Sequence, residues 1–507
     1  MLEFIDKHLL TLIIFAPLAG CILVIILPAG EKGIVSKIVS LFASLIALIL
    51  SIKMLSCFDP NQTTMQFVER ITWIKSIGIH YYLGGDGLSV PLIVLTTLLS
   101  AVSLIASWGI TDRCKGYFSL FLILEMSMLG VFCALDFFLF YVFWEIMLVP
   151  MYFLIGIWGG PRKEYAAIKF FLYTLIGSLC MLLAILAMYF TVGENTFDML
   201  RIAEVLSVDA RAAGAFGIIV FIALFIGFAI KVPIFPFHTW LPDAHVEAPT
   251  AVSVILAGVL LKMGTYGLLR VNFPILPDAA HTLAPWIAIL GVINILYGSL
   301  VAMAQQDLKK LIAYSSIGHM GFCVLGIATF QTQAVNGAIM QMLNHGMVTA
   351  GLFLIAGVIY DRAHTRGVNE FGGLATRFPI YSGFVSLVFF ASLGLPGLNS
   401  FWGEFLVLVG SFNSPAPINW AANFFPLMVY IAVLGIVITA AYHLWTIQRM
   451  FLGPFNEKWS HLKDMDYREI ITLTPTAIFA VTIGVYPRLI LDLFTPYTDA
   501  LLKWMGG

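Results

Sequence analysis

The sequence predicts an all-α polytopic membrane protein, and three observations lead to that prediction. Of the 507 residues, 60% are hydrophobic and only 11% are charged, whereas soluble proteins carry about 25% charged residues. The chain divides into about fourteen apolar segments, each long enough to cross a bilayer core of about 30 Å. Two of these segments are interrupted by prolines and glycines, which is typical of transporters that bind ions at broken helices.

The apolar segments follow one another closely and leave no room for a soluble domain. They are expected at residues 9–28, 34–56, 87–110, 117–135, 137–158, 170–192, 212–240, 248–269, 283–303, 311–330, 334–360, 380–410, 422–448 and 470–492. No small-residue cleavage site follows the first segment, which we interpret as a retained helix and not as a signal peptide.

The two interruptions predict an internal repeat. Proline removes a backbone donor and clashes with the preceding turn, so PIFPFHTW from Pro233 and PGLNSFW from Pro396 should each break a helix. Each break falls in the fourth member of a run of five segments. Because five is an odd number of membrane crossings, the second run starts on the opposite side of the membrane and is inverted relative to the first. We therefore expect two inverted five-helix repeats, each containing a discontinuous helix. The predicted divisions are an N-terminal three-helix segment (1–116), the first repeat (117–269), the second repeat (283–448), and a C-terminal loop with the last helix (449–507).

The distribution of basic residues predicts the orientation. Sixteen of the 27 Lys and Arg residues lie in connections that follow odd-numbered segments, and eight lie on the opposite side. Since basic loops stay in the cytoplasm, both termini are expected on the outer side of the membrane. Three lysines remain inside spans. Lys53 is near enough to a helix end to reach the interface, whereas Lys231 and Lys262 are not.

Lys231 and Lys262 are the first candidate functional residues. A lysine in the bilayer costs at least about 3 kcal/mol on insertion scales, so it normally faces a bundle interior or a water-filled path. Glu145 lies in the middle of FFLFYVFWEIMLVPMYF and is a suitable partner. Because burial disfavours the charged form of either group, a Glu–Lys pair can take up or release a proton when its separation changes. The alternative is a pair that only holds helices together.

Further titratable residues are spread through both predicted repeats. His319 and His345 lie inside the tenth and eleventh segments, and Glu404 follows the second break. These residues suit a proton relay, although a buried histidine can equally be a hydrogen-bonded packing residue. Glu125 lies in the middle of the fourth segment, where a structural role and a functional role are both open.

Metal, haem and nucleotide sites are not indicated. His238 and His245 lie near the first break, but no matching histidine pair exists on a second helix. Asp243, His245 and Glu247 are expected in a short loop, which they shape or in which they line a proton entrance. The six cysteines form no CxxC motif, and no phosphate-binding loop or iron–sulfur cysteine cluster is present. The chain is therefore suited to moving ions but has no visible energy source, and we expect no cofactor on it.

Several motifs resemble one known family. They are LEMSMLGVF (124–132), FYVFWE (140–145), PMYFLIGIWGG (150–160), KVPIFPFHTWLPDAHVEAPT (231–250), AGVLLKMGTYGLLR (257–270), QQDLKKLIAYSSIGHMGF (305–322), LNHGMVTAGLFLIAG (343–357) and GLPGLNSFWGEF (394–405). Together they resemble the antiporter-like membrane subunits of proton-pumping NADH:quinone oxidoreductase, respiratory complex I. The length and the first two motifs are similar to the M group of bacterial chains, the counterparts of mitochondrial subunit 4. The large subunits of multisubunit cation/proton antiporters belong to the same superfamily and are the main alternative.

The resemblance assigns roles to matching residues. It implies that Glu145 and Lys231 control proton loading and that Lys262 connects them to the second half. His319 and His345 match relay positions there, and Glu404 suits proton release.

The resemblance also implies partners. FMN, iron–sulfur clusters and quinone would be bound by partner subunits, and the neighbours in the membrane arm would be the L and N chains and lipids. No nucleic acid is expected. A non-transporting scaffold of a membrane complex is a more distant alternative.

Overall fold

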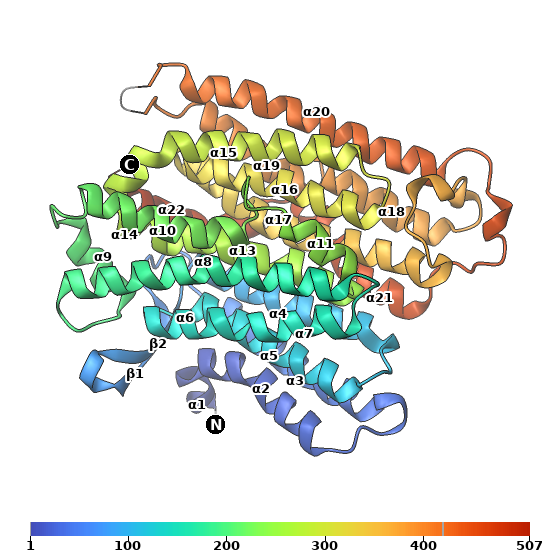
Figure 1. The fold of residues 1–507 in the computed structure, drawn as a ribbon, viewed down its shortest axis with the longest axis horizontal. Coiled ribbons are helices and arrows are strands. Elements are labelled where there is room, and N and C mark those ends of the chain that lie inside the picture. The colour runs from blue at the N-terminus through green and yellow to red at the C-terminus, as the bar shows by residue number, and fades with distance from the viewer. Residues whose placement is uncertain (1, 418–419, 507) are drawn as a thin grey trace.

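The computed structural model describes residues 2–417 and 420–506, and the chain folds into a bundle whose helices run mostly along its longest axis (Figure 1). The helices are α1 (Leu2–Lys7), α2 (Leu9–Ile26), α3 (Ile34–Cys57), α4 (Ser89–Ala106), α5 (Cys114–Cys133), α6 (Phe137–Ile146), α7 (Leu148–Trp158), α8 (Lys163–Val192), α9 (Met199–Ser207), α10 (Ala215–Lys231), α11 (Trp240–Glu247), α12 (Thr250–Ile255), α13 (Leu261–Gly267), α14 (Phe273–Ile275), α15 (Pro277–Met303), α16 (Leu308–Ile327), α17 (Thr332–Ala363), α18 (Pro379–Ser392), α19 (Asn399–Phe412), α20 (Phe424–Phe451), α21 (Tyr467–Val485) and α22 (Arg488–Trp504). The strands are β1 (Gln66–Ile74) and β2 (Ile79–Gly85).

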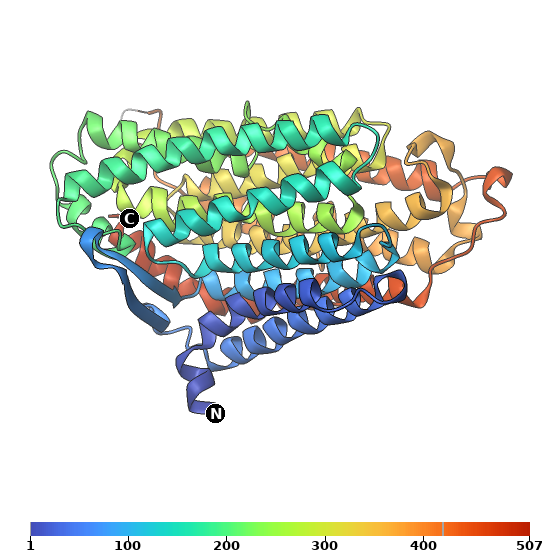
Figure 2. The same ribbon diagram turned by 60° about the horizontal axis from the view of Figure 1, so that its bottom comes forward.

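The helices are stacked broadly in chain order. In Figures 1 and 2, the blue helices α2 and α3 form one side of the bundle. Figure 1 shows α20 at the opposite side, with α8 and α10 between them. The exception is the C-terminal pair, because α21 and α22 return to pack against α4 and α17 in the middle. The last helices therefore join the N-terminal part of the chain to its second half.

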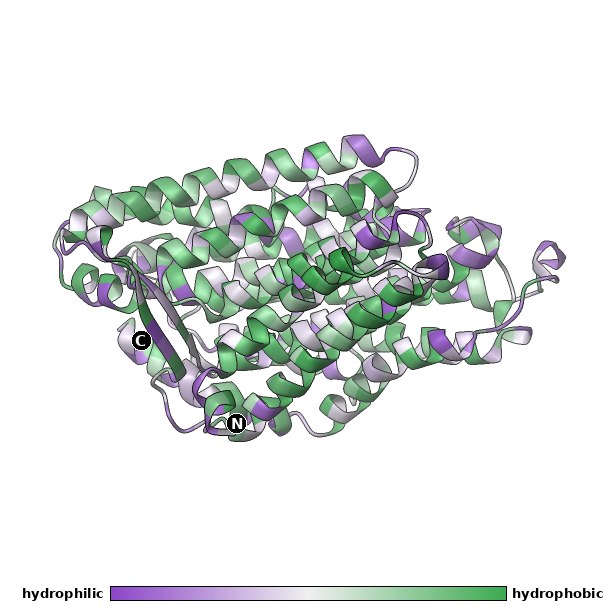
Figure 3. Cartoon of the chain, turned by 90° about the horizontal axis from the view of Figure 1, so that it is seen from below, coloured by the Kyte–Doolittle hydropathy of each residue, from purple (hydrophilic) through white to green (hydrophobic). Residues whose placement is uncertain are grey.

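The predicted polytopic membrane fold is confirmed. Within the described residues, twelve helices are long and apolar enough to cross a membrane. Two shorter apolar helices, α10 and α18, end where the sequence predicts breaks. Hydrophobic residues predominate along the helices, and hydrophilic residues gather towards both ends of the bundle (Figure 3). The exact number of fourteen spans and the inverted relation of the two repeats remain predictions.

Two parts of the structure differ from the predicted elements. Strands β1 and β2 form an antiparallel hairpin in a stretch that we expected to be a connection. The last predicted span, 470–492, is also too long, because α21 ends at Val485 and a separate helix, α22, begins at Arg488. Tyr486 and Pro487 interrupt the helix there, since proline cannot donate the backbone hydrogen bond that would continue it.

The connections after the odd-numbered predicted segments meet at one end of the bundle. The backbone N–H of Gly160 donates to the carbonyl oxygen of Glu247. Arg366 donates to the Asp307 carboxylate at 3.1 Å and to the Val246 carbonyl at 2.9 Å. The hairpin, α9 and α22 lie at the opposite end, as does α1 (Figure 1). The alternation of the chain between two faces therefore agrees with the predicted topology.

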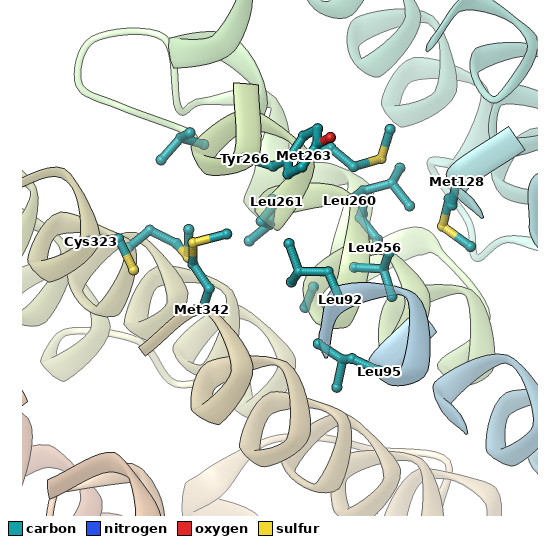
Figure 4. Close-up of a cluster of buried hydrophobic side chains, with 14 of the residues drawn as sticks. Leu92, Leu95, Met128, Leu256, Leu260, Leu261, Met263, Tyr266, Cys323 and Met342 are labelled. Carbon is teal, nitrogen blue, oxygen red and sulfur yellow. The ribbon is translucent and has the colours of Figure 1, made fainter. Parts of the chain in front are cut away.

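The helix that carries Lys262 lies at the centre of the apolar core. It runs from Thr250 to Ile275, is buried along its length, and contains two π-helical turns, η4 (Leu256–Leu260) and η5 (Leu268–Asn272). Figure 4 shows the side chains around it, which include Leu92 and Leu95 from α4, Met128 from α5, Cys323 from α16 and Met342 from α17. A charged side chain on this helix can therefore be stabilised only by polar groups inside the bundle.

Candidate proton-transfer site

Lys262 is the centre of the site. Its side chain is fully buried on α13, and its Nζ donates to the carbonyl oxygen of Ala257 at 2.6 Å. That carbonyl belongs to the π-helical turn η4, five residues earlier in the chain. Wide turns of this kind occur often at functional sites because they leave backbone groups available. The same Nζ lies 2.6 Å from Nδ1 of His345 on α17.

His345, His319 and Glu404 continue the row from Lys262. The rings of His345 and His319, which come from the adjacent helices α17 and α16, have their centroids 5.7 Å apart. Nδ1 of His319 lies 3.1 Å from Oε1 of Glu404 on α19. All four side chains are at most 4% exposed. Four of the six predicted residues thus form one buried row, with Lys262 at one end and Glu404 at the other.

The second helix break places Glu404 in this row. Helix α18 ends at Ser392, whose Oγ lies 3.3 Å from Nε2 of His319, and α19 begins at Asn399. Between them, Gly394 has a φ of +80° and lies so close to Glu404 that a Cβ atom on it would be 2.7 Å from Oε2. Glycine is therefore needed here both for the backbone conformation and for the space.

Lys231 lies apart from the row, at the first break. It is the last residue of α10, is buried, and has no hydrogen-bond partner for its Nζ among the described residues. The ammonium lies 5.5 Å from the ring centroids of both Trp144 and Phe170. Aromatic faces attract a cation without accepting a hydrogen bond from it, so this lysine is held in a loose, partly apolar environment.

The break itself is fixed by a buried asparagine and a tryptophan. The side chain of Asn294 on α15 accepts from the N–H of Phe235 at 2.7 Å and donates to the carbonyl of Pro233 at 3.2 Å. Nε1 of Trp240 donates to the carbonyl of Ile230 at 2.9 Å. These bonds satisfy backbone groups that the broken helix leaves free.

Glu145 does not form the expected contact pair with Lys231. No ion pair joins the two side chains, and Oε1 of Glu145 is buried without a partner among the residues described. The rings of Trp144, next to Glu145, and of Phe170 lie beside the lysine in place of a carboxylate contact.

The structure also places the other polar residues near the first break. We expected a short loop at Asp243, His245 and Glu247. These residues lie instead in the short helix α11. His238 lies 3.1 Å from the Tyr297 hydroxyl, whereas His245 stacks on Phe353. In the described parts of the chain, no group of three His, Cys, Asp or Glu side chains could hold a metal ion.

Besides Lys37, which is 4% exposed on α3, two buried cations were missed by sequence reasoning. Lys309, which we assigned to a connection, lies in the first turn of α16, where it is 3% exposed and donates to the Ala248 carbonyl at 2.7 Å. Arg270, also assigned to a connection, is buried on η5 and pairs with Asp86 at 2.6 Å. Only the tertiary packing buries these two residues. For Lys309 and Arg270, the one signal in the sequence was that each lies within two residues of an apolar segment.

Comparisons with known proteins agree with this architecture. A family described as NADH:quinone oxidoreductase/Mrp antiporter, TM, matches residues 134–450. The chain belongs to this family. The matched region contains the two broken helices and all six predicted site residues.

Similar proteins are bacterial and mitochondrial members of the family. NADH-quinone oxidoreductase subunit M of Rhodobacter capsulatus is 43% identical over 98% of this chain and 97% of its own length. NADH-ubiquinone oxidoreductase chain 4 of Arabidopsis thaliana is 42% identical over 95% of this chain and 94% of its own. The resemblance to the M group and to mitochondrial subunit 4 is therefore confirmed.

Solved structures show the same fold. A chain of respiratory complex I from Thermus thermophilus with bound NADH has a TM-score of 0.86 and 28% identity, and the match covers 98% of this chain and 100% of that one. A chain of an Mrp complex from a Dietzia species has a TM-score of 0.82 and 25% identity, but the match covers only 52% of that chain. The predicted membership in a multisubunit membrane complex is supported by both.

Proposed function

We propose that this chain is the proton-translocating membrane subunit of an NADH:quinone oxidoreductase and couples electron transfer from NADH to quinone with proton pumping. The observation that carries this proposal is the buried row Lys262–His345–His319–Glu404. Each member can bind or release a proton. Lys262 contacts His345, His319 contacts Glu404, and the centroids of the two imidazole rings are 5.7 Å apart. Ionisable groups inside a membrane cost free energy, so four titratable side chains in an apolar core point to a function such as proton conduction.

The proposed path begins at the end of the bundle where the basic connections meet. A cavity of about 480 Å³ opens there, lined by Glu247, Lys309 and Asp361 among other residues. Protons entering from this side load the region of Glu145 and Lys231. A change in their separation, driven by quinone reduction elsewhere in the complex, lowers the proton affinity of the lysine and moves a proton towards Lys262. Glu404 then releases it on the opposite side.

The chemistry of electron transfer is assigned to partner subunits. NADH, FMN, iron–sulfur clusters and quinone bind to those chains, and this chain carries no redox centre. Its neighbours in the membrane arm are the antiporter-like L and N chains. The chain spans the inner membrane of a bacterium, with the end that bears α1 and α22 on the periplasmic side, because the opposite end has the larger number of basic residues.

A large subunit of a multisubunit cation/proton antiporter is the second candidate. It is favoured by the common family and by the fold of the Mrp chain. It is disfavoured because the chain is 43% identical to the subunit M relative and 25% identical to the Mrp chain. Sodium- or potassium-dependent growth after deletion of the gene would favour it, whereas co-purification with flavin and iron–sulfur chains would exclude it.

The test uses Lys262→Met in the assembled complex. This substitution keeps an apolar side chain of similar length and removes the proton-carrying group. Quinone-coupled NADH oxidation should fall by about 10²-fold, the lower part of what a positioned proton-transfer group contributes. NADH oxidation with an artificial acceptor should remain intact.

Lys53→Met is the matched control. Lys53 also lies in a membrane-spanning helix, but it pairs with Asp6 near the helix end. Coupled activity should be retained in this variant. Equal coupled activity of Lys262→Met and the unaltered complex would contradict the proposal.

A further inference from the structure

Glu125 is a buried acid outside the row just described. It lies on α5, is fully buried, and accepts a hydrogen bond through Oε1 from the Ser44 hydroxyl on α3 at 2.9 Å. Its second oxygen, Oε2, has no partner among the described residues. No basic side chain in the described part of the chain forms an ion pair with it. A lone carboxylate in such a place is very unfavourable, so the neutral acid is the form that this environment supports.

A row of serine hydroxyls on α3 leads to this carboxyl group. Ser36, Ser40 and Ser44 are spaced four residues apart, lie on one face of the helix, and are at most 1% exposed. The hydroxyls of Ser36 and Ser40 have no partner in the described part of the chain. Buried polar groups are normally hydrogen-bonded, and where protein atoms do not serve, an internal water does.

Some buried hydroxyls of the bundle are free in the same way, among them those of Ser100, Ser103 and Ser119, whereas others bond to the backbone. Serine and threonine in a membrane helix usually bond to a carbonyl of the preceding turn. Ser127 on α5 donates to the Ile123 carbonyl, and Thr96 on α4 donates to that of Leu92. Ser36 and Ser40 do not use this option. Close helix packing explains small residues on α3, but it explains neither their unbonded hydroxyls nor a carboxyl group without a cation.

The row of serines begins at a polar depression on the molecular surface. A hollow of about 530 Å³ next to the start of α3 is lined by Lys32, Arg113 and Lys115 among other residues. From Ser36 to Ser44 the helix rises about 12 Å, at 1.5 Å per residue. The hollow reaches Gly33 but not Ser36, so its water is separated from Glu125 by about three helical turns, or about 16 Å from Gly33 to Ser44. The buried hydroxyl groups of Ser36, Ser40 and Ser44 lie along this distance.

We propose that Glu125 is a second proton-binding site of this chain, a neutral carboxylic acid that binds internal water and exchanges its proton with the basic end of the molecule along Ser40 and Ser36. The exchange is balanced: the acid gives its proton to the water beside Oε2 and receives another from that water. No other reactant is needed. The site does not depend on the proposed central path, because it uses α3 and α5 alone.

The test is infrared spectroscopy of the purified complex at neutral pH. A protonated carboxyl group has a C=O stretching band that is separate from those of carboxylates and moves to lower frequency when O–H becomes O–D. The unaltered complex minus the Glu125→Gln variant should show this band. Glu164→Gln, which alters an exposed acid, should leave the band unchanged. A carboxylate band in place of the acid band would overturn the proposal.

A second variant keeps the test decisive if Glu125→Gln does not assemble. Ser44→Ala removes the hydrogen bond to Oε1 and retains the acid. The band of Glu125 should therefore move to higher frequency without losing intensity. An unchanged spectrum would show that no protonated acid is bonded to Ser44.

The route is tested by the rate of exchange in heavy water. Ser40→Val removes one hydroxyl and fills the space of a water, so the shift of the Glu125 band after transfer to D₂O should become at least tenfold slower. Ser51→Val is the matched control, since Ser51 lies on the same buried face of α3 but beyond Glu125 from the hollow. Equal exchange rates in the two variants would exclude this route.

Discussion

The two buried lysines predicted to be functional, Lys231 and Lys262, have very different partners, although the sequence presents them alike. Lys262 touches a carbonyl oxygen and an imidazole nitrogen, whereas Lys231 faces two aromatic rings and has no hydrogen bond within the described structure. An ammonium that gives up a proton loses less stabilisation where no acceptor holds it. Lys231 is accordingly the better site for a proton that must leave again.

Trp144→Leu tests this view of Lys231. Loss of the aromatic face should weaken the hold on the cation by up to about 2 kcal/mol, or about thirtyfold in an equilibrium. We expect coupled turnover to fall several-fold, measured as quinone-dependent NADH oxidation. Trp144→Phe retains a ring and should keep most activity. Equal losses in the two variants would indicate that only the size of the side chain matters.

The sequence could identify the candidate residues but not their contacts. A charge inside an apolar segment is visible at once, which is how Lys262, His319 and Glu404 were found. Lys262 and His345 are 83 residues apart in the chain, and only helix packing brings them together. The aromatic rings that lie beside Lys231 come from Trp144 and Phe170 on other helices, and no local pattern specifies these contacts.

Among the elements, the two broken helices have the clearest effect on the site. The prolines predict the breaks, yet the sequence does not say what the breaks position. The second one brings a glycine against the carboxyl group of Glu404, and the first one leaves Lys231 at a helix end. A broken helix therefore serves here to place a titratable group at a chosen depth.

Gly394→Ala tests the placement of Glu404. A methyl group at Gly394 would meet Oε2 of Glu404, and the positive φ would be strained by about 1–3 kcal/mol. We expect a lower melting temperature and a loss of most coupled activity. Gly397→Ala is the matched control, because Gly397 has a φ of +93° but no atom within 4 Å of a Cβ. It should lose similar stability and keep its activity. Full coupled activity in Gly394→Ala would refute the role given to this glycine.

The elements that sequence reasoning missed are those stabilised by their surroundings. The hairpin of β1 and β2 contains alternating β-branched and aromatic residues such as Ile71, Trp73 and Tyr81, a pattern typical of strands. Because the hairpin lies between two long apolar segments, we interpreted its sequence as a simple connection between membrane-spanning helices. The first turn of α16 begins at an Asp307 cap, so the helix takes up Lys309 and buries it.

For the whole molecule, one ion pair joins three distant parts of the chain. Asp86 lies just before α4 and also accepts from the backbone N–H groups of Leu88 and Ser89. Its partner Arg270 belongs to the central helix and lies 5.3 Å from the ring centroid of Tyr497 on α22. The N-terminal segment, the first predicted repeat and the last helix are thus connected at a single buried point.

Arg270→Leu should destabilise the whole molecule. Removing one partner of a buried ion pair leaves an uncompensated charge and costs about 3–5 kcal/mol. The melting temperature of the purified complex should fall clearly. The double variant Asp86→Asn with Arg270→Leu removes that charge and should recover part of the loss. A double variant less stable than Arg270→Leu would show that Asp86 acts mainly as a helix cap.

The contact between Lys262 and His345 has one more consequence under the proposed function. When the lysine donates to Nδ1, the imidazole carries its own hydrogen on Nε2, so the ring is in one defined tautomer. A proton that enters at Nδ1 and departs from Nε2 leaves the ring in the other tautomer. The imidazole must then flip or exchange its hydrogens before it can accept again. Conduction along this row is therefore stepwise, with one proton transferred each time the His345 ring returns to its starting tautomer.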